Sequence, residues 1–444
     1  MRGTLGFQSS LVRARPHLSN LPPVYFKLGL RRGAATWQGI RKTYRGIPKG
    51  FKPVDIVDHG IAVNIDVGRR RNFLPGIWLR DNCRCSSCVN QDTMQRNFNT
   101  FDIPATIQPK ETVSSKEGLA ITWPDGHQSE YSWDFIRHYL KNNHRNVDES
   151  RDPRPLCFGP DIAEDPPSVD YQRVMLPDDT GVAELTDKIK THGFAFVDNT
   201  PYEDPEDTKR LLERIAFIRV THYGGFYDFT PDLSMADTAY TNIALPAHTD
   251  TTYFTDPAGL QSFHLLSHTP APDTVQDTRP EGGKSLLVDG FGAANKLFHE
   301  DPLAYTILSK VRLPWHASGN KGITIAPDKR YPVLELDEDT GKLQRIRWNN
   351  DDRGVVPWDG EYSPDQWYEA ARKWDSILRR DDTQCWIQLV PGRVLIFDNW
   401  RVLHGRSAFT GIRRICGAYI NRDDFISRWR NTNFNREELL KVIG

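Results

Sequence analysis

Two histidines and one aspartate of this sequence have the residue types of a mononuclear metal site. His248 and Asp250 are separated by one residue, so in a β-strand both side chains would point to the same face. His404 lies far along the chain, in residues 400–406, and would bring a second imidazole. Two imidazoles and one carboxylate leave coordination positions open, which suits a non-haem Fe(II) oxygenase. Because His-x-Asp is a common pattern and the chain has 13 histidines, the surrounding sequence has to decide its meaning.

A second group of metal-binding residue types lies near the N-terminus. Cys83, Cys85 and Cys88 fall within six positions, and such clustering favours a metal site over a disulfide framework. With His127, they would form the closed tetrahedral set of a structural zinc ion. Three free thiols on a loop beside a surface histidine are the alternative. The pattern specifies the cysteines more tightly than it specifies the histidine.

The elements that must position these residues divide into two domains. Short apolar alternations broken by turns predict a small, β-rich zinc-binding domain over residues 51–145. Its predicted strands lie at residues 54–57, 61–65, 77–79 and 119–123. A charged, proline-rich linker is expected at 146–168, because prolines at this density sustain neither a helix nor a central strand. A larger domain at 169–430 and a C-terminal tail at 431–444 complete the chain.

The larger domain is predicted to have an α+β fold that is mainly β. Few helices flanking many short strands favour a β-sandwich or barrel as the core, with His404 at the end of a strand. The predicted helices lie at 182–190, 205–218, 294–309 and 363–380. The predicted strands lie at 194–197, 285–290, 385–390, 392–397 and 415–420. A polar loop at 270–283 has the length of a functional or mobile loop.

The N-terminal segment differs in charge from the rest of the chain. Residues 1–54 hold eleven basic residues and no acidic one, and the remaining chain has 46 basic against 58 acidic residues. This composition predicts a mitochondrial transit peptide over residues 1–50 and a matrix location; a disordered tail, a nucleic-acid arm and a cytoplasmic location are the alternatives. The acidic remainder argues against a nucleic-acid partner. No apolar stretch approaches the roughly 18 residues of a membrane span.

Four motifs occur in order along the chain and resemble one known family. They are Gly-Ile-Trp-Leu-Arg-Asp-Asn-Cys at 76–83, Trp-Pro-Asp-Gly-His at 123–127, Ala-Tyr-Thr at 239–241 leading to His-Thr-Asp-Thr-Thr-Tyr-Phe at 248–254, and Asp-Asn-Trp-Arg-Val-Leu-His-Gly-Arg at 398–406. The family is the gamma-butyrobetaine and trimethyllysine dioxygenases of carnitine biosynthesis, and the trimethyllysine branch matches better. The resemblance implies a double-stranded β-helix (jelly-roll) core, Fe(II), 2-oxoglutarate as cosubstrate, ascorbate as reductant, a zinc-binding N-terminal domain and a homodimer.

The resemblance also implies roles for individual residues. His248, Asp250 and His404 match the iron ligands, and no catalytic side chain is expected beyond the metal centre. Arg413 matches the arginine that binds the distal carboxylate of 2-oxoglutarate, a role that suits a guanidinium fork. Its neighbour Arg414 is the alternative, because adjacent strand residues point to opposite faces. Ser285 resembles a small hydroxyl that assists at the same carboxylate.

The substrate end of the site needs a different chemistry. A trimethylammonium group has no N–H to donate, so aromatic ring faces have to bind it. Four tyrosines match the family's aromatic cage, with tyrosine at position 227 where tryptophan is expected, and core packing is the alternative for each. These are Tyr223, Tyr227, Tyr240 and Tyr419. Asp237 is expected to pair with the substrate α-ammonium, unless it is only a turn residue. Asn349, Asn350 and Arg353 are candidates for binding the substrate carboxylate.

The reaction implied by the resemblance is hydroxylation of N6,N6,N6-trimethyl-L-lysine at C3. It would consume O2 and 2-oxoglutarate, give 3-hydroxy-trimethyllysine, succinate and CO2, and begin carnitine biosynthesis. The main alternative is gamma-butyrobetaine hydroxylation to L-carnitine on the same machinery. A non-catalytic jelly-roll binding protein is the more distant alternative, and the complete ligand set argues against it.

Overall fold

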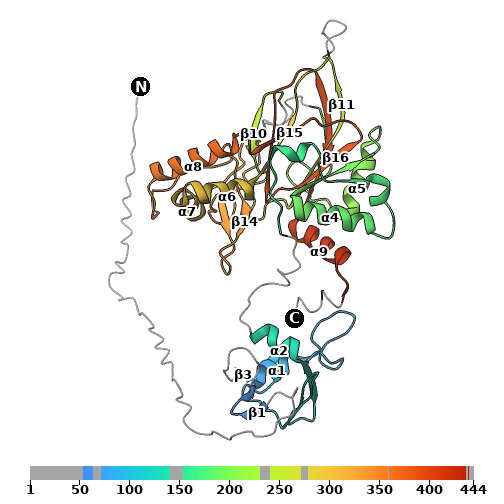
Figure 1. Cartoon of the computed structure of the whole chain (residues 1–444), viewed down its shortest axis with the longest axis vertical. Helices are drawn as coiled ribbons and strands as arrows, with labels where there is room; N and C mark the ends of the chain where they lie inside the picture. The colour runs from blue at the N-terminus through green and yellow to red at the C-terminus, as the bar shows by residue number, and fades with distance from the viewer. Residues whose placement is uncertain are drawn as a thin grey trace, which may run out of the picture. The chain divides into compact units, whose positions relative to one another are not determined.

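The computed structural model describes residues 54–63, 72–140, 154–230, 241–271, 279–358 and 360–436, together with residue 439. The predicted transit peptide, Asp237 and Tyr240 lie outside these residues, as do residues 272–278 of the loop predicted at 270–283. The chain forms two compact units, Met1–Trp133 and Asp134–Gly444 (Figure 1). No helix in the described part of the chain has the length and apolar character needed to cross a membrane.

The N-terminal unit contains two small antiparallel sheets. One has strands β1 (Val54–Val57), β2 (Gly60–Val63) and β3 (Asn72–Pro75), and the other has β4 (Glu111–Ser114), β5 (Gly118–Thr122) and β6 (Gln128–Ser132). The strand predicted at 77–79 is wrong, because these residues belong to helix α1 (Gly76–Asp81). Gly76 and Leu79 are one helical turn apart and both are buried, a spacing that a three-residue apolar run could not reveal. A 3-10 turn, η1 (Thr100–Asp102), precedes β4, and helix α2 (Trp133–Leu140) follows β6.

Two antiparallel-rich sheets form the centre of the larger unit. The larger sheet has the order β7-β8-β16-β11-β18-β9, with β19 paired to β11, and the smaller sheet has the order β10-β17-β12-β15. The larger sheet comprises β7 (Ser168–Asp170), β8 (Phe194–Asp198), β9 (Tyr227–Phe229), β11 (Leu260–Thr269), β16 (Arg393–Asp398), β18 (Ile412–Gly417) and β19 (Tyr419–Ile420). The smaller sheet comprises β10 (Leu245–His248), β12 (Ser285–Asp289), β15 (Gln384–Ile387) and β17 (Val402–Arg406).

One buried apolar cluster joins the two sheets. Its residues come from both sheets, so each sheet buries a face against the other. They include Phe194, Phe196, Leu395 and Phe397 of the larger sheet and Leu287, Cys385 and Val402 of the smaller one. Burying each large apolar side chain contributes roughly 1.5–3 kcal/mol, so the cluster fixes the spacing of the sheets that hold the candidate ligands.

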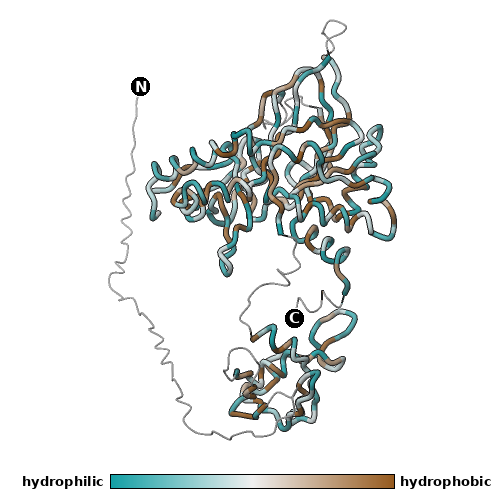
Figure 2. Tube along the Cα trace, in the orientation of Figure 1, coloured by the Kyte–Doolittle hydropathy of each residue, from teal (hydrophilic) through white to brown (hydrophobic). Residues whose placement is uncertain are grey.

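Helices cover the other face of the larger sheet. α4 (Thr180–His192), α5 (Pro205–Ile215) and α9 (Arg422–Asn433) share a buried cluster with β8 and β16, and they lie on one side of this unit in Figure 1. α4 ends at Gly193, whose φ of +84° closes the helix. α5 ends at Ile215, earlier than predicted. Two short segments, η2 (Pro160–Ala163) and α3 (Tyr171–Val174), precede α4 in the chain. Figure 2 shows hydrophobic and hydrophilic residues alternating around the helices, as amphipathic helices require.

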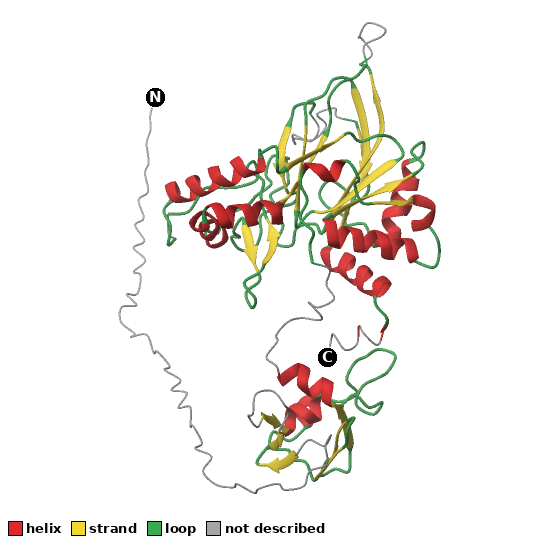
Figure 3. Ribbon diagram, viewed as in Figure 1, coloured by secondary structure: helices red, strands yellow, loops and turns green. Residues whose placement is uncertain are grey.

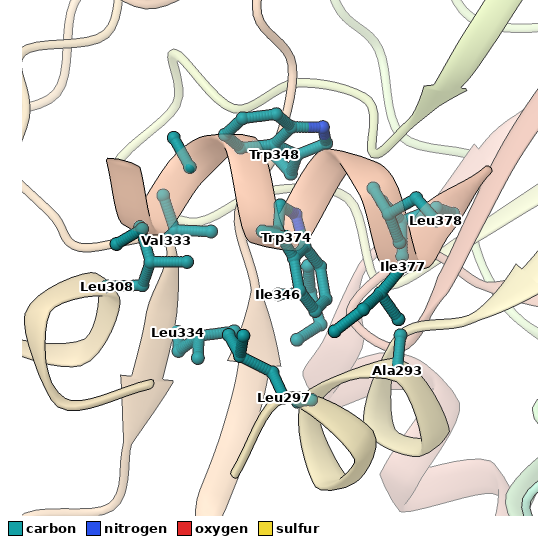
Figure 4. Packing of buried hydrophobic residues seen from close by; sticks show 14 of the residues in the cluster. Ala293, Leu297, Leu308, Val333, Leu334, Ile346, Trp348, Trp374, Ile377 and Leu378 are labelled. Atoms are coloured by element: carbon teal, nitrogen blue, oxygen red, sulfur yellow. The ribbon is translucent and has the colours of Figure 1, made fainter. Parts of the chain in front are cut away.

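A helical layer with a small hairpin flanks the other side of the strands (Figure 3). It contains α6 (Gly290–Glu300), α7 (Pro302–Lys310), α8 (Pro364–Leu378), β13 (Leu334–Leu336) and β14 (Leu343–Ile346). Figure 4 shows Trp374 and Ile377 of α8 pointing toward Leu297 and Ala293 of α6.

The single helix predicted at 294–309 is wrong, because the chain forms two helices there. Asp301 caps α7 by accepting a hydrogen bond from the Ala304 N–H at 2.9 Å, and Pro302 cannot donate a helical hydrogen bond back into α6. The chain therefore starts a new helix at Pro302 in a changed direction.

Candidate iron and cosubstrate site

The two histidines lie opposite each other on paired strands. His248 is the last residue of β10, and its register partner in the neighbouring β17 is His404. Their ring centroids are 4.3 Å apart. The long sequence separation between them is thus bridged by one antiparallel strand pair of the smaller sheet.

Asp250 reaches the histidines from beyond the end of β10. Its Oδ1 lies 3.2 Å from His248 Nε2 and 3.8 Å from His404 Nε2. Strand alternation does not produce this approach, since the strand ends at His248 and Thr251 has a φ of +58°. Positive φ is costly for a β-branched residue, so the neighbouring contacts have to impose it.

Asn399 holds the backbone of Asp250 in place. Its Oδ1 accepts a hydrogen bond from the Asp250 N–H at 2.8 Å, and its Nδ2 donates to the Asp250 carbonyl at 3.0 Å. The same Nδ2 donates to the Ala258 carbonyl at 3.0 Å, across the turn. Buried Arg347 adds a further restraint by donating to the Phe254 carbonyl at 2.8 Å and to Glu335 at 2.7 Å. Together, these contacts of Asn399 and Arg347 hold the turn that follows Asp250.

The three side chains present one ligand atom each toward a common point. His248 Nδ1 lies 2.9 Å from the Pro246 carbonyl, so this nitrogen carries a proton, and in the neutral imidazole Nε2 is the nitrogen that can bind a metal. The candidate ligand atoms of His248, Asp250 and His404 all lie within 4.8 Å of one another. Metal–ligand bonds of about 2.0–2.2 Å place adjacent ligand atoms about 3 Å apart, so the three residues fit a divalent metal ion.

Charge coupling within the group is strong. Burial lowers the pKa of His404 to about 3, and the positive charge of His248 lowers it further. Burial alone would lower the pKa of His248 too, but the Asp250 carboxylate outweighs it and raises the pKa to about 9. Burial would raise the pKa of Asp250, yet the imidazoles of His404 and His248 hold it below its ordinary value. The carboxylate is therefore ionised, as a metal ligand has to be.

Two residues that the sequence did not identify as neighbours of Asp250 hold its other oxygen. Gln261 Nε2 donates to Asp250 Oδ2 at 2.7 Å, and the Tyr419 hydroxyl donates to the same atom at 2.6 Å. Burial and the nearby carboxylate raise the pKa of Tyr419 well above its usual value, so the hydroxyl keeps its proton. Gln261 is the second residue of Leu260–Thr269, a stretch that mixes polar and apolar residues, so no local signal in the sequence marked it.

A cavity of about 360 Å³ opens beside these groups. Nine residues singled out in the sequence line it: His248, Asp250, His404, Arg413, Ser285, Tyr223, Tyr227, Tyr419 and Asn349. Lining residues that the sequence analysis missed include His222, Tyr253, Phe263, Asp351 and Asp352. The structure thus brings the predicted ligands, the predicted arginine and three of the four predicted tyrosines around one space.

Arg413 and Arg414 have different surroundings. Arg413 is 1% exposed, and its Nε and Nη1 have no hydrogen-bond partner among the described residues. Burial lowers the pKa of Arg413 to about 10, with a smaller contribution from Arg406. Arg414 instead forms an exposed ion pair with Asp228, at 2.5 and 2.9 Å. The buried guanidinium at the cavity wall is therefore that of Arg413, and its N–H groups can receive an anion.

Two residues, Phe409 and Gly283, pack against the Arg413 side chain at the cavity wall. Its guanidinium carbon lies 5.0 Å from the centroid of the Phe409 ring. Gly283 packs on the other part of the side chain, since a Cβ at this position would lie 3.0 Å from Arg413 Nε. Ser285, two residues later, is 9% exposed and lines the same cavity.

The cavity tyrosines do not all present the same group. The Tyr227 hydroxyl donates to the Ser262 carbonyl at 2.6 Å, which fixes its ring at a centroid distance of 6.0 Å from Tyr419, edge to face. The ring of Tyr223 lies against that of His222, at a centroid distance of 3.9 Å and a tilt of 40°. Tyr419 turns its hydroxyl to Asp250, so it offers the substrate only its ring.

The three candidates for the substrate carboxylate are also separated. Asn349 lines the cavity, and its Nδ2 donates to Asp352 at 3.0 Å. Asn350 and Arg353 line a neighbouring cavity instead, where the Arg353 guanidinium lies 5.2 Å from the centroid of the Trp367 ring. Of the three, Asn349 is the one that borders the site.

The cysteine cluster lies within the N-terminal unit. His127 Nε2 is 3.3 Å from the sulfur atoms of Cys83 and Cys88 and 3.7 Å from that of Cys85. A tetrahedral zinc ion with bonds of about 2.3 Å to sulfur and 2.0 Å to nitrogen gives separations of this size. Arg80 donates to the Cys88 sulfur at 3.2 Å. The α1 helix carries Arg80, and the β5–β6 turn carries His127.

Comparison with known proteins is consistent with this arrangement. Residues 150–419 match the family model for taurine catabolism dioxygenases, the TauD, TfdA family, and residues 58–137 match the model for the gamma-butyrobetaine hydroxylase-like N-terminal domain. A trimethyllysine dioxygenase of Neurospora crassa is 56% identical over 98% of this chain and 98% of its own length. A mitochondrial trimethyllysine dioxygenase of Homo sapiens is 39% identical over 80% of this chain and 81% of its own.

The chain is also similar, at lower identity, to a gamma-butyrobetaine dioxygenase. A gamma-butyrobetaine dioxygenase of Homo sapiens is 27% identical over 81% of this chain and 91% of its own length. The identity to this relative is about half of that to the fungal trimethyllysine dioxygenase. The chain therefore belongs to the TauD, TfdA family of dioxygenases and, within it, to the trimethyllysine dioxygenases.

Proposed function

We propose that this protein hydroxylates N6,N6,N6-trimethyl-L-lysine at C3, using Fe(II), O2 and 2-oxoglutarate and releasing succinate and CO2. The observation that carries the proposal is the convergence of His248, Asp250, His404 and Arg413 on one cavity. The 56% identity to a trimethyllysine dioxygenase supports the choice of substrate. The product, 3-hydroxy-trimethyllysine, would enter carnitine biosynthesis.

His248, Asp250 and His404 would hold the iron. When bound, Fe(II) supplies the activation of O2 that couples the decarboxylation of 2-oxoglutarate to hydroxylation of the substrate. The three side chains line the cavity, so a metal ion held by them would have further coordination positions open toward it. No proton-transferring side chain is required at the substrate carbon, so the contribution of the protein is ligation, orientation and the exclusion of water.

Arg413 would bind the distal carboxylate of 2-oxoglutarate. Two of its N–H groups have no acceptor among the described residues, and burial makes an unpaired guanidinium costly. A carboxylate would give this buried guanidinium a charged hydrogen-bond acceptor. Ser285 lies on β12, where it pairs in register with Arg406, and its hydroxyl could supplement that contact.

The two sheets would correspond to a double-stranded β-helix, or jelly roll, with the site at its open end. Antiparallel pairing of β10 with β17 and of β11 with β16 and β18 supports this topology. Sandwiches of this kind carry ligands between their sheets, at the mouth of the core.

The substrate would bind with its trimethylammonium group against tyrosine rings. Tyr223, Tyr227 and Tyr419 line the cavity, and Tyr227 stands where the resemblance expects tryptophan. Asp351 and Asp352 add negative charge to the same wall, which favours a substrate bearing two ammonium groups. Tyr240 as a fourth ring and Asp237 as the partner of the α-ammonium remain predictions. Asn349 is the candidate that borders the cavity at the substrate carboxylate.

Separate incubations with the two substrates test the choice of reaction. The purified protein is incubated with trimethyllysine or gamma-butyrobetaine, and succinate and hydroxylated product are measured together. Coupled product from trimethyllysine is expected. Turnover of gamma-butyrobetaine with none of trimethyllysine would favour the alternative dioxygenase.

A ligand variant tests whether the protein is an enzyme of this type at all. His248→Ala removes one imidazole from the proposed iron site and is expected to abolish 2-oxoglutarate decarboxylation. Unchanged decarboxylation in this variant would refute the iron site, whereas absence of decarboxylation in the wild-type protein would favour a non-catalytic jelly roll.

Four further properties belong to this proposal. Cys83, Cys85, Cys88 and His127 would hold a structural zinc ion, as their spacing supports. Residues 1–50 would direct import into the mitochondrial matrix, in line with the relative from Homo sapiens whose name includes a mitochondrial location. Ascorbate as reductant and a homodimeric assembly follow from the family resemblance. Recovery of a protein that still begins at Met1 from mitochondria-free cytosol would argue against import.

A further inference from the structure

The two oxygens of Asp250 have different partners. Oδ1 faces the imidazoles, at 3.2 Å from His248 Nε2 and 3.8 Å from His404 Nε2. Oδ2 points away from them and accepts two hydrogen bonds, at 2.7 Å from Gln261 and 2.6 Å from Tyr419. Because both bonds end on the same oxygen, the carboxylate has a single preferred orientation.

The sheet explains why both donors reach one atom. Gln261 of β11 and Tyr419 of β19 are register partners on paired antiparallel strands. Directly opposite residues project from the same face of a sheet, so their side chains reach the same side of the strands. Gln261 is 2% exposed and Tyr419 is 7% exposed, which keeps water from competing for Oδ2.

We propose that Gln261 and Tyr419 are positioning residues that hold Asp250 so that it binds the metal through Oδ1 alone. The proposal rests on the iron site of the proposed function. A free carboxylate can bind a metal through one or both oxygens, and two donors on Oδ2 oppose the second mode. The coordination position that a second oxygen would occupy thus stays open for the cosubstrate.

Tyr419 then has two separate roles at the site. Its ring stands edge to face with that of Tyr227, where it can contact a quaternary ammonium, and its hydroxyl holds a metal ligand. A single side chain would thus connect the substrate end of the cavity with the metal end. Tyr419→Phe separates the roles, because phenylalanine keeps the ring and loses the hydroxyl.

Metal affinity is the measurement that tests the proposal. Full-length apoprotein is titrated with Mn²⁺, and free Mn²⁺ is followed by electron paramagnetic resonance; Mn²⁺ favours carboxylate over thiolate ligands, so the cysteine cluster interferes little. Tyr419→Phe and Gln261→Met, which keeps the side-chain length without the donor, are each expected to raise the Kd for Mn²⁺ by about 10- to 100-fold. In the double variant, the loss of binding free energy for Mn²⁺ is expected to be smaller than the sum of the losses in the two single variants, because both donors act on one oxygen.

Tyr227→Phe is the matched control. Its hydroxyl is part-buried and lies 2.6 Å from its acceptor, as the Tyr419 hydroxyl does, but that acceptor is the Ser262 carbonyl. The control is therefore expected to leave the Kd for Mn²⁺ within about twofold of wild type, and a weakening equal to that of Tyr419→Phe would show a general loss of structure and overturn the proposal.

The outcomes separate this proposal from the proposed function. If His248→Ala abolishes Mn²⁺ binding while Tyr419→Phe and Gln261→Met bind as tightly as wild type or more tightly, the positioning role is wrong and the iron site stands. If His248→Ala binds Mn²⁺ like wild type, the iron site itself is wrong, and the proposed function fails with it.

Discussion

Replacing Gly283 with alanine is expected to weaken the binding of 2-oxoglutarate through a neighbouring side chain. Gly283 is buried and has a φ of +68°. A Cβ at this position would lie 3.0 Å from Arg413 Nε and 3.1 Å from Arg413 Cζ. Such contacts require the guanidinium to shift by a few tenths of an ångström, away from the place where it would bind a carboxylate.

The size of the effect follows from the bond that is disturbed. A hydrogen bond to a charged group contributes about 1.5–3 kcal/mol. If the shift forfeits half of one such bond, the KM for 2-oxoglutarate rises roughly 3- to 12-fold, at about 1.4 kcal/mol per factor of ten. The kcat at saturating 2-oxoglutarate is expected to stay near that of wild type, because the metal ligands are untouched.

Gly341 provides a control with the same backbone strain. It also has a φ of +68°, but a Cβ there would meet no heavy atom within 4 Å. Both alanine variants should therefore lose about 1–2 kcal/mol of unfolding free energy from left-handed backbone, as urea titration can measure. Only Gly283→Ala should raise the KM, measured by succinate formation at varied 2-oxoglutarate. Equal KM values in the two variants would refute the role given to Arg413.

Three further results are expected. Through His264 alone, the free energy of unfolding should fall by about 2 kcal/mol from pH 7 to pH 5, because burial lowers its pKa to about 4 and the unfolded chain takes up the proton first. Urea titrations of wild type and His264→Gln check this, and an equal pH dependence would contradict it. Arg401→Met leaves the buried Asp289 carboxylate without its cation and should lower the free energy of unfolding by about 3–5 kcal/mol. The control Arg379→Met breaks an exposed ion pair and should lower it by less than about 1 kcal/mol. Equal losses in the two variants would disprove the reasoning. Cys85→Ser should lower the zinc content found by metal analysis, and an unaltered content would place the zinc elsewhere.

The sequence predicted the parts of the fold that local signals specify. α4, α5 and α8 begin or end at residues with clear roles, such as Gly193 with its positive φ and Pro205 and Pro364 in the first turn. α1 was mistaken for a strand, because three apolar residues in a row fit either period. Strand β11 was not predicted at all.

The reason β11 escaped prediction is instructive for the site. Its ten residues include Gln261, Ser262 and His264, which interrupt the apolar run that would mark a buried strand. Each of these polar side chains has a partner elsewhere: Gln261 donates to Asp250, and His264 lies 2.7 Å from the Thr208 hydroxyl. Such long-range partners cannot be read from one sequence, so the residues that obscured the strand include one at the centre of the candidate site.

The convergence of His248 and Asp250 was expected for a reason that is only partly right. The sequence treated them as neighbours on one strand face, whereas β10 ends at His248 and the chain turns at Thr251. Asn399, far along the chain, makes the turn possible by pairing with both backbone groups of Asp250. The residue types identified the chemistry, and tertiary contacts decided the geometry.

The pairing of β10 with β17 also sets the order in which the site can be assembled during synthesis. The strand that carries His404 is made long after the strand that carries His248, and Arg413 and Tyr419 come later still. Contacts between residues so distant in sequence form slowly, because a long loop has to close first. A nascent chain therefore has no complete iron site until its last strands have left the ribosome, and truncation before β17 removes a ligand, the arginine and the tyrosine together.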